Sequence, residues 1–133
     1  AAKKVAAKKT PAKKTTTAKK TTAKKNIKKD ICVLDFAFQR IGGKYKGRIL
    51  WALSKHTVMR YGELSREISD ISTKMLTQTL RELEMDNLIH REMYPQVPPK
   101  VEYSLTETGK ELIPFIKYLV DWGYKKMAEE NEN

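Results

Sequence analysis

Several residue types are scarce in this sequence of 133 residues, and each shortage excludes a class of protein. Cys32 is the one cysteine, so no disulfide can form within the chain. The two histidines, His56 and His90, lie far apart and have no cysteine, aspartate or second histidine at ligand spacing, so we expect no metal site. No apolar run approaches the roughly 18 to 20 residues of a membrane span. We therefore expect a cytoplasmic protein that does not enter a membrane.

Motifs for catalysis and cofactor binding are also missing. The pair Gly42-Gly43 is typical of a helix end, where glycine adopts the left-handed conformation, and is not part of a phosphate-binding loop. No serine, histidine and aspartate occur in an arrangement that supports nucleophilic catalysis. We therefore expect neither an enzyme nor a bound cofactor.

The formal net charge of +11 belongs entirely to the first 30 residues. Residues 1–30 contain 12 of the 27 lysines and arginines and a single acid, Asp30, so residues 31–133 carry no net charge. The segment is built almost entirely of alanine, lysine and threonine and cannot bury enough apolar surface to fold, so we expect a disordered basic tail over residues 1–30. Its paired lysines favour non-specific attraction to DNA phosphates, and a purely solubilising extension is the alternative.

Residues 31–128 have the apolar spacing of a mainly α domain with one small β-hairpin, an α+β fold. The first predicted helix ends at Gly42-Gly43, and Ser72 is the predicted N-cap of the fourth. The helices before the hairpin are predicted over residues 33–41, 44–54, 61–68 and 73–85. A tight connection at residues 69–71 separates the third helix from the fourth, an order typical of a helix-turn-helix.

Three prolines within residues 95–99 mark the tip of the predicted hairpin, because proline cannot continue a helix or a central strand. Residues on both sides alternate in polarity, which predicts strands over 88–94 and 101–105. Thr106 then caps a last helix, expected from Glu107 to about Met127 and bent at Pro114 or following a loose first turn. The acidic residues 129–133 are expected to fray. This order of elements predicts a winged helix-turn-helix.

The fourth predicted helix carries the candidate DNA-binding site. Lys74, Gln78 and Arg81 stand at i, i+4 and i+7, so three long polar side chains share one stripe that can enter a major groove. The opposite, buried side is expected to contain Met75, Leu76, Leu80 and Leu83, with Thr79 near the boundary. The acids Glu82, Glu84 and Asp86 come late in the helix, away from the turns expected to point into DNA.

Further DNA-binding candidates surround this stripe. They are Ser72, Thr73 and Thr77 at or within the same helix, Arg60 and Tyr61 at the start of the preceding helix, and Gln96 and Lys100 at the hairpin tip. A polar helix face is most often simply solvated, and a hairpin tip is most often an ordinary surface turn. The position of this helix between a tight turn and a proline-tipped hairpin favours DNA binding.

Several segments in the same order resemble the HxlR-type family of bacterial regulators, and together they cover about residues 32–123. The segments are residues 41–46 (IGGKYK), 49–50 (IL), 60–64 (RYGEL), 71–78 (ISTKMLTQ), 80–84 (LRELE), 94–106 (YPQVPPKVEYSLT), 106–109 (TETG) and 122–123 (WG). The resemblance implies a homodimer joined largely through its first and last helices. It also implies two recognition helices in successive major grooves of a near-palindromic operator. The surplus of apolar residues on the last helix agrees with such an interface.

Cys32 matches a family position at which some members sense electrophiles, oxidants or aldehydes. The sequence departs from the family pattern at Val33, where proline is usual. A reactive thiol needs nearby positive charge, which Lys28 and Lys29 can supply. The alternative is a small apolar residue buried near the dimer interface.

The sequence as a whole predicts a sequence-specific transcriptional regulator that binds double-stranded DNA as a homodimer, in the cytoplasm at the nucleoid. A redox or electrophile response through an unidentified small-molecule or oxidant effector is a further hypothesis. The alternative function is a histone-like architectural protein in which the tail dominates binding, since residues 1–29 resemble the tails of linker histones and bacterial histone-like proteins. The neutral charge of residues 31–133 favours the alternative, whereas the predicted recognition helix and hairpin favour the regulator.

Overall fold

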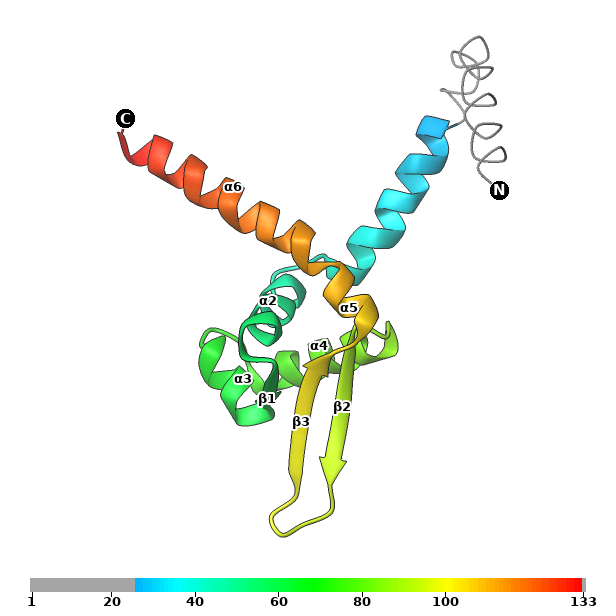
Figure 1. Ribbon diagram of the computed structural model, residues 1–133, viewed down its shortest axis with the longest axis vertical. Helices are drawn as coiled ribbons and strands as arrows, with labels where there is room; N and C mark the ends of the chain where they lie inside the picture. Colours follow the sequence, from blue (N-terminus) through cyan, green and yellow to red (C-terminus); the bar gives the residue numbers. More distant parts are fainter. Residues whose placement is uncertain (1–25, 133) are drawn as a thin grey trace, which may run out of the picture. The chain divides into compact units, whose positions relative to one another are not determined.

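The computed structural model describes residues 26–132, and the part of the predicted tail up to residue 25 lies outside the described range (Figure 1). The chain divides into two units, one ending at Gln39 and one beginning at Arg40, and each is described by itself. In the first unit, the described residues, from residue 26 onward, form one helix that ends at residue 41, just inside the second unit.

This first helix begins within the segment that we expected to be disordered. Residues 26–30 are helical, whereas the sequence led us to expect order only from residue 31. Ile27, Ile31, Leu34 and Phe38 recur at helical spacing, and the lysines between them are good helix formers. The composition of residues 1–30 as one block concealed this pattern, so the expectation of disorder was wrong for residues 26–30.

The second unit contains the predicted helix-turn-helix. Helices α2 (Lys46–His56) and α3 (Tyr61–Glu67) precede α4 (Thr73–Met85), whose ends agree with the prediction. The Ser72 hydroxyl oxygen accepts a hydrogen bond from the Met75 backbone N–H at 3.1 Å, so the predicted N-cap is confirmed. The cap fixes the residue at which the candidate recognition helix begins.

A three-stranded antiparallel sheet follows, with the strand order β1-β3-β2. The predicted hairpin consists of β2 (Ile89–Tyr94) and β3 (Lys100–Leu105), and in Figure 1 it extends past α3 and α4. The sequence did not reveal β1 (Val58–Arg60), which pairs with β3 so that Met59 lies opposite Tyr103. Three residues are too few to show an alternating pattern.

The core of this unit fixes which side of α4 faces outward. The side chains that are fully or almost fully withdrawn from water come from four elements and are Ile49, Leu50, Leu53, Leu64, Leu76, Leu80, Leu83 and Ile89. We expected Met75 on the buried side, but Met75 is 41% exposed and Thr79 is only 5% exposed. Leu76, Thr79, Leu80 and Leu83 form one stripe at helical spacing, and Met75 lies about 100° from its neighbour Leu76. The Thr79 hydroxyl donates to the Met75 carbonyl at 2.7 Å, which satisfies the buried polar group.

The predicted last helix is two helices, α5 (Glu107–Glu111) and α6 (Ile113–Glu132). Pro114 is the second residue of α6, where a missing backbone N–H costs little, so the break lies at Leu112. We expected fraying from residue 129, but α6 continues to Glu132, because alanine and glutamate favour helix and Lys126 lies 3.0 Å from Glu129. Within residues 26–132, no helix is both long enough and apolar enough to cross a membrane.

A close approach between backbones joins the hairpin to α5. The Thr106 hydroxyl donates to the Asn87 carbonyl at 2.6 Å and accepts from the Gly109 N–H at 3.0 Å, so Thr106 caps α5 as expected. A side-chain carbon at Gly109 would overlap the Leu88 carbonyl oxygen. Only glycine fits this position without a shift of the backbone.

Candidate nucleic-acid interface

The outward face of α4 presents the predicted polar stripe. Lys74, Gln78 and Arg81 are exposed, as are Thr73 and Thr77. The buried stripe on the opposite side holds this orientation, because a rotation of α4 about its axis would bring leucines to the surface. The five polar side chains therefore lie on one accessible surface of the helix.

Tyr61 fixes the start of α3 against the first turns of α4. Its hydroxyl donates to the Thr73 carbonyl at 3.0 Å and lies 2.9 Å from the Thr77 hydroxyl oxygen. Because the phenol has one proton and gives it to the carbonyl, Thr77 is the donor of the second hydrogen bond. We predicted a phosphate contact for Tyr61, and the structure adds a role in positioning the two elements.

Glu82 links Gln78 to a lysine from a different helix. The Gln78 Nε2 donates to Glu82 Oε2 at 3.1 Å, and Lys46 Nζ lies 3.1 Å from Glu82 Oε1. The hydrogen bond from Lys46, followed by the one from Gln78, outweighs the loss of surrounding water and lowers the pKa of the Glu82 carboxyl. We expected Glu82 to lie apart from the site, but it contacts one of the site's own side chains. Lys46 was not among the candidates at all.

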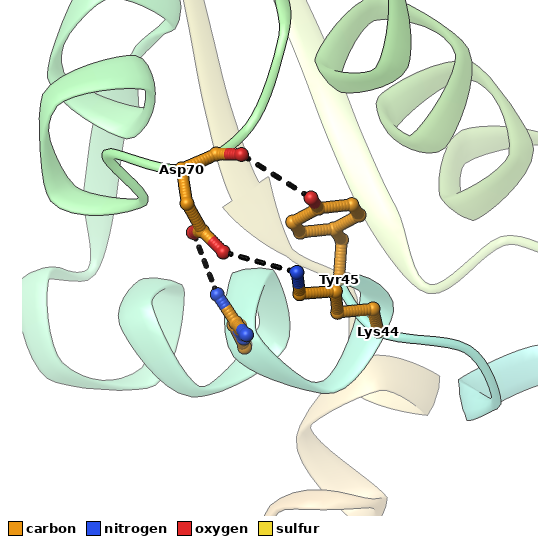
Figure 2. A network of polar contacts seen from close by, with 4 residues as sticks. Lys44, Tyr45 and Asp70 are labelled. Atoms are coloured by element: carbon orange, nitrogen blue, oxygen red, sulfur yellow. Dashed lines mark hydrogen bonds and ion pairs between the residues drawn. The ribbon is translucent and has the colours of Figure 1, made fainter.

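A cluster around Asp70 joins the turn between α3 and α4 to the start of α2 (Figure 2). Lys44 Nζ lies 3.4 Å from Asp70 Oδ2, Arg48 donates to Oδ1 at 2.8 Å, and the Tyr45 hydroxyl donates to the Asp70 carbonyl at 3.3 Å. Loss of water raises the pKa of the Asp70 carboxyl, but the hydrogen bond from Lys44, a backbone hydrogen bond and the Arg48 charge outweigh it. The pKa therefore lies below its ordinary value of 3.8.

The hairpin tip presents one of its two candidate side chains freely and holds the other against the strands. Gln96 is exposed, whereas Lys100 Nζ lies 3.6 Å from Glu102 Oε2 and 4.5 Å from the centre of the Tyr94 ring. The hydrogen bond with Glu102 and the charge of Glu102 raise the pKa of the Tyr94 hydroxyl. The Lys100 ammonium group thus contacts an acid and an aromatic ring of its own hairpin.

Two neighbouring hollows lie beside the hairpin, one against the start of α3 and the other against α4. One, of about 300 Å³, brings together four predicted residues, because Arg60, Tyr61, Gln96 and Lys100 all line it. The other, of about 510 Å³, is lined by Thr77, Arg81, Glu84 and Arg91 among others. Tyr61 and Val101 line both. Thr77 and Arg81 of α4 thus border the same continuous surface as Arg60, Gln96 and Lys100, and Arg91 adds a third arginine to it.

Cys32 lies in the first helix and is exposed. Lys28 and Lys29 precede it by four and three residues in the same helix, so both lie on its side of the helix. This exposure is that of a single copy of the chain, so the alternative of a residue buried near the dimer interface stays a prediction. Whether the thiol reacts with oxidants also stays a prediction.

Two helices expose apolar side chains. On α6 the large exposed residues are Phe115, Tyr118, Leu119, Trp122, Tyr124 and Met127. On the first helix they are Ile27, Ile31, Val33, Leu34, Phe36 and Phe38. Apolar surfaces of this extent are typical of protein interfaces.

No three histidine, cysteine or acidic residues of the described chain are grouped so that they can hold a metal ion.

Comparison with known families agrees with this geometry. The profile of the HxlR-like helix-turn-helix family matches residues 40–131, which include α4, the hairpin and most of α6. The chain belongs to the HxlR-like helix-turn-helix family. The predicted family and the predicted winged helix-turn-helix fold are confirmed.

Relatives of this HxlR-like protein are similar over most of their length. An HTH-type transcriptional regulator of Methanothermobacter thermautotrophicus is 48% identical over 103 residues, which are 77% of each chain. The HTH-type transcriptional regulator YkvN of Bacillus subtilis is 50% identical over 97 residues, which are 73% of this chain and 81% of YkvN. Among solved structures, the redox regulator HypR in its oxidised form is 45% identical with a TM-score of 0.68, covering 71% of this chain and 96% of HypR.

Proposed function

We propose that this protein regulates transcription by binding double-stranded DNA sequence-specifically as a homodimer. The observation that carries the proposal is that Thr77 and Arg81 of α4 line a hollow that shares Tyr61 and Val101 with the hollow lined by Arg60, Gln96 and Lys100. A helix with exposed donors beside a hairpin fits the geometry in which one element enters the major groove and the other follows the backbone. The relatives named as transcriptional regulators support the same function.

Some of the candidate side chains are placed to contact bases and others to contact phosphates. Gln78 and Arg81, with Lys74, are placed to reach base edges, where arginine pairs with guanine and glutamine with adenine. Arg60, Gln96 and Lys100 are placed to contact phosphates, together with the residues of the first turn of α4, including Thr73. This proposal requires no catalysis and no cofactor, and it places the protein in the cytoplasm at the nucleoid.

The exposed apolar residues of α6 and of the first helix support a homodimer. Helix α6 has 20 residues and is therefore about 30 Å long, enough for an extended interface with a second copy. A two-fold axis would place two copies of α4 on successive half-sites, so the operator is near-palindromic. Leu119→Glu is expected to give a monomer in sedimentation equilibrium and to reduce operator affinity, whereas Lys125→Glu on the same helix leaves the dimer intact.

We further propose that Cys32 makes DNA binding responsive to oxidants or electrophiles. The thiol is exposed and lies one turn after two lysines, which favour the reactive thiolate. The similarity to HypR, a redox regulator, supports this role.

The DNA-binding proposal is tested by selecting bound duplexes from a pool of random double-stranded DNA with the full-length protein. We expect one enriched near-palindromic site, with Arg81→Ala and Gln78→Ala each relaxing the preference at specific base pairs. Arg66→Ala is the matched control, since Arg66 lies at the other end of α3 beside His56 and Glu67. The α4 assignment fails if the two α4 variants bind the selected site as well as the parent does.

A further inference from the structure

We infer that Lys46 and Glu82 are positioning residues, which hold the Gln78 amide in one orientation and so make Gln78 selective for adenine. The inference rests on the proposed function, because it requires that α4 enters the major groove. It concerns one base pair in each half-site and the hydrogen bonds that the Gln78 amide forms with it.

The three side chains form a chain of contacts from the start of α2 to the outward face of α4. Each oxygen of the Glu82 carboxylate has its own partner: Oε1 lies 3.1 Å from Lys46 Nζ, and Oε2 accepts from Gln78 Nε2 at 3.1 Å. The Lys46 side chain is only 15% exposed, so it is largely withdrawn from water and its charge benefits from a nearby anion.

An ionised carboxylate accepts hydrogen bonds and donates none, which decides how the amide can lie. A glutamate carboxyl is ionised at neutral pH, and the contacts with Lys46 and Gln78 lower the pKa of Glu82 further. If the Gln78 amide turned over, its carbonyl oxygen would face a carboxylate oxygen and be repelled. The amino group therefore faces Glu82, which leaves one N–H and the carbonyl oxygen of Gln78 for DNA.

One donor beside one acceptor matches the major-groove edge of adenine. The Gln78 carbonyl oxygen accepts from the adenine N6 amino group, and the remaining N–H donates to adenine N7. Guanine presents two acceptors, O6 and N7, so the carbonyl oxygen would be repelled there. Holding the amide in this orientation therefore favours adenine over guanine at the base pair that Gln78 meets.

Lys46 also explains why an acid is tolerated on the DNA-facing helix. A carboxylate near DNA is repelled by phosphates, and an exposed glutamine–glutamate contact on one helix is weak by itself. The ammonium group of Lys46 offsets the negative charge of Glu82 and adds a contact from a second helix, which restricts the carboxylate. The acid thus contributes orientation with little electrostatic cost.

The test uses the full-length protein and the duplex selected from random double-stranded DNA. The base pair read by Gln78 is the one at which Gln78→Ala loses preference, and four duplexes that differ only there are titrated. We expect the parent to prefer adenine over guanine by roughly ten-fold or more. Glu82→Gln and Lys46→Met should both reduce this preference to about two-fold or less, with the other positions unchanged.

The two variants separate positioning from simple charge effects. Glu82→Gln removes a negative charge and should strengthen binding to all DNA, whereas Lys46→Met removes a positive charge and should weaken it. Only a shared role in orienting Gln78 makes both variants lose adenine preference. Glu84→Gln, which removes the same charge from α4, should strengthen binding and keep the preference.

Each outcome decides the inference. It is overturned if Gln78→Ala relaxes one position and Glu82→Gln keeps the full adenine preference there, and the proposed function then stands. It is also overturned if the relaxed position prefers guanine in the parent. If Gln78→Ala relaxes no position, both the inference and the assignment of Gln78 fail. Should Lys46→Met melt at a lower temperature than the parent, Glu82→Gln alone decides.

Discussion

The Arg48 guanidinium lies 2.8 Å from the Asp70 carboxylate, a contact that joins the first turns of α2 to the turn before α4. Lys44 lies 3.4 Å from the same carboxylate, so two cations from one segment meet the acid of another. The position of the turn determines where α4 begins. This surface cluster therefore supports the orientation of the candidate recognition helix.

The Asp70 cluster makes part of the stability dependent on pH. The pKa of Asp70 is lower in the folded protein than its ordinary value of 3.8, so its contribution is present above that pH and is lost as pH falls through the folded value. Asp70→Asn is therefore expected to lower the melting temperature near pH 7, with the difference from the parent vanishing well below pH 3.8. Melting curves across this range measure it, and Glu111→Gln on α5 is the control. An equal difference at all pH values would mean that the ionised carboxylate is not responsible.

The hydrogen bonds of Tyr61 to α4 should contribute to the free energy of unfolding. Tyr61→Phe removes two hydrogen bonds, to the Thr73 carbonyl and from the Thr77 hydroxyl, and is expected to lower the free energy of unfolding by about 1 kcal/mol. Urea unfolding measures this loss, and Thr77→Val in the Tyr61→Phe background should cost less than in the parent. Tyr124→Phe, at a hydroxyl on the exposed part of α6, should cost nothing measurable. Additive effects of the Tyr61 and Thr77 changes would contradict the coupling.

The sequence predicted the parts of the fold that depend on local patterns. The ends of α4 follow from a strong N-cap at Ser72 and an apolar stripe, and both are visible within a few residues of sequence. The strand β1 was missed because its three residues are defined by pairing with β3, which lies more than 40 residues further along the chain. Met75 was misplaced for a different reason: the buried stripe of α4 is centred on Leu76, Thr79, Leu80 and Leu83, and helical spacing alone did not show that its edge excludes Met75.

The candidate site shows the same division between local and long-range information. The stripe of Lys74, Gln78 and Arg81 follows from helical spacing, and the structure leaves it exposed. The contact of Lys46 with Glu82 joins residues that are 36 positions apart, so no local sequence pattern predicts it. The spacing of Gln78 and Glu82 at i and i+4 was the one local signal.

Gly109 is expected to tolerate no side chain. A Cβ there would overlap the backbone carbonyl oxygen of Leu88, which cannot move without disturbing the start of β2 and the cap of α5. Gly109→Ala should lower the free energy of unfolding by about 3 kcal/mol. Gly47→Ala in α2 is the control, because no atom lies within 4 Å of its added carbon, and it should raise stability by about 0.5 to 1 kcal/mol. Equal effects of the two changes in urea unfolding would contradict the close approach.

Deletion of residues 1–25 separates the regulator from the histone-like alternative. The deletion stops at residue 25 so that every described residue of the first helix is kept, and it removes ten lysines. Under the proposed function, affinity falls and its dependence on salt becomes less steep, by about 0.9 in the logarithmic slope for each phosphate that the tail no longer neutralises. The ratio of affinities for the selected duplex and for a scrambled duplex should persist. If the shortened protein binds neither duplex, or binds both equally, the architectural role is favoured.

Substitution of Cys32 tests whether this thiol makes DNA binding responsive to oxidants. Hydrogen peroxide oxidises the thiolate to a sulfenic acid and releases hydroxide, which takes up a proton to give water; condensation with the Cys32 thiol of a second subunit would release another water and leave a disulfide. We expect peroxide to change the operator affinity of the parent several-fold and to leave Cys32→Ser unaffected, with intact mass identifying the product. Lys28→Gln combined with Lys29→Gln should slow the reaction, because two positive charges that favour the thiolate are removed. If Cys32→Ser responds to peroxide as the parent does, the sensing role is wrong, while DNA recognition by α4 remains a separate question that the base-pair variants answer.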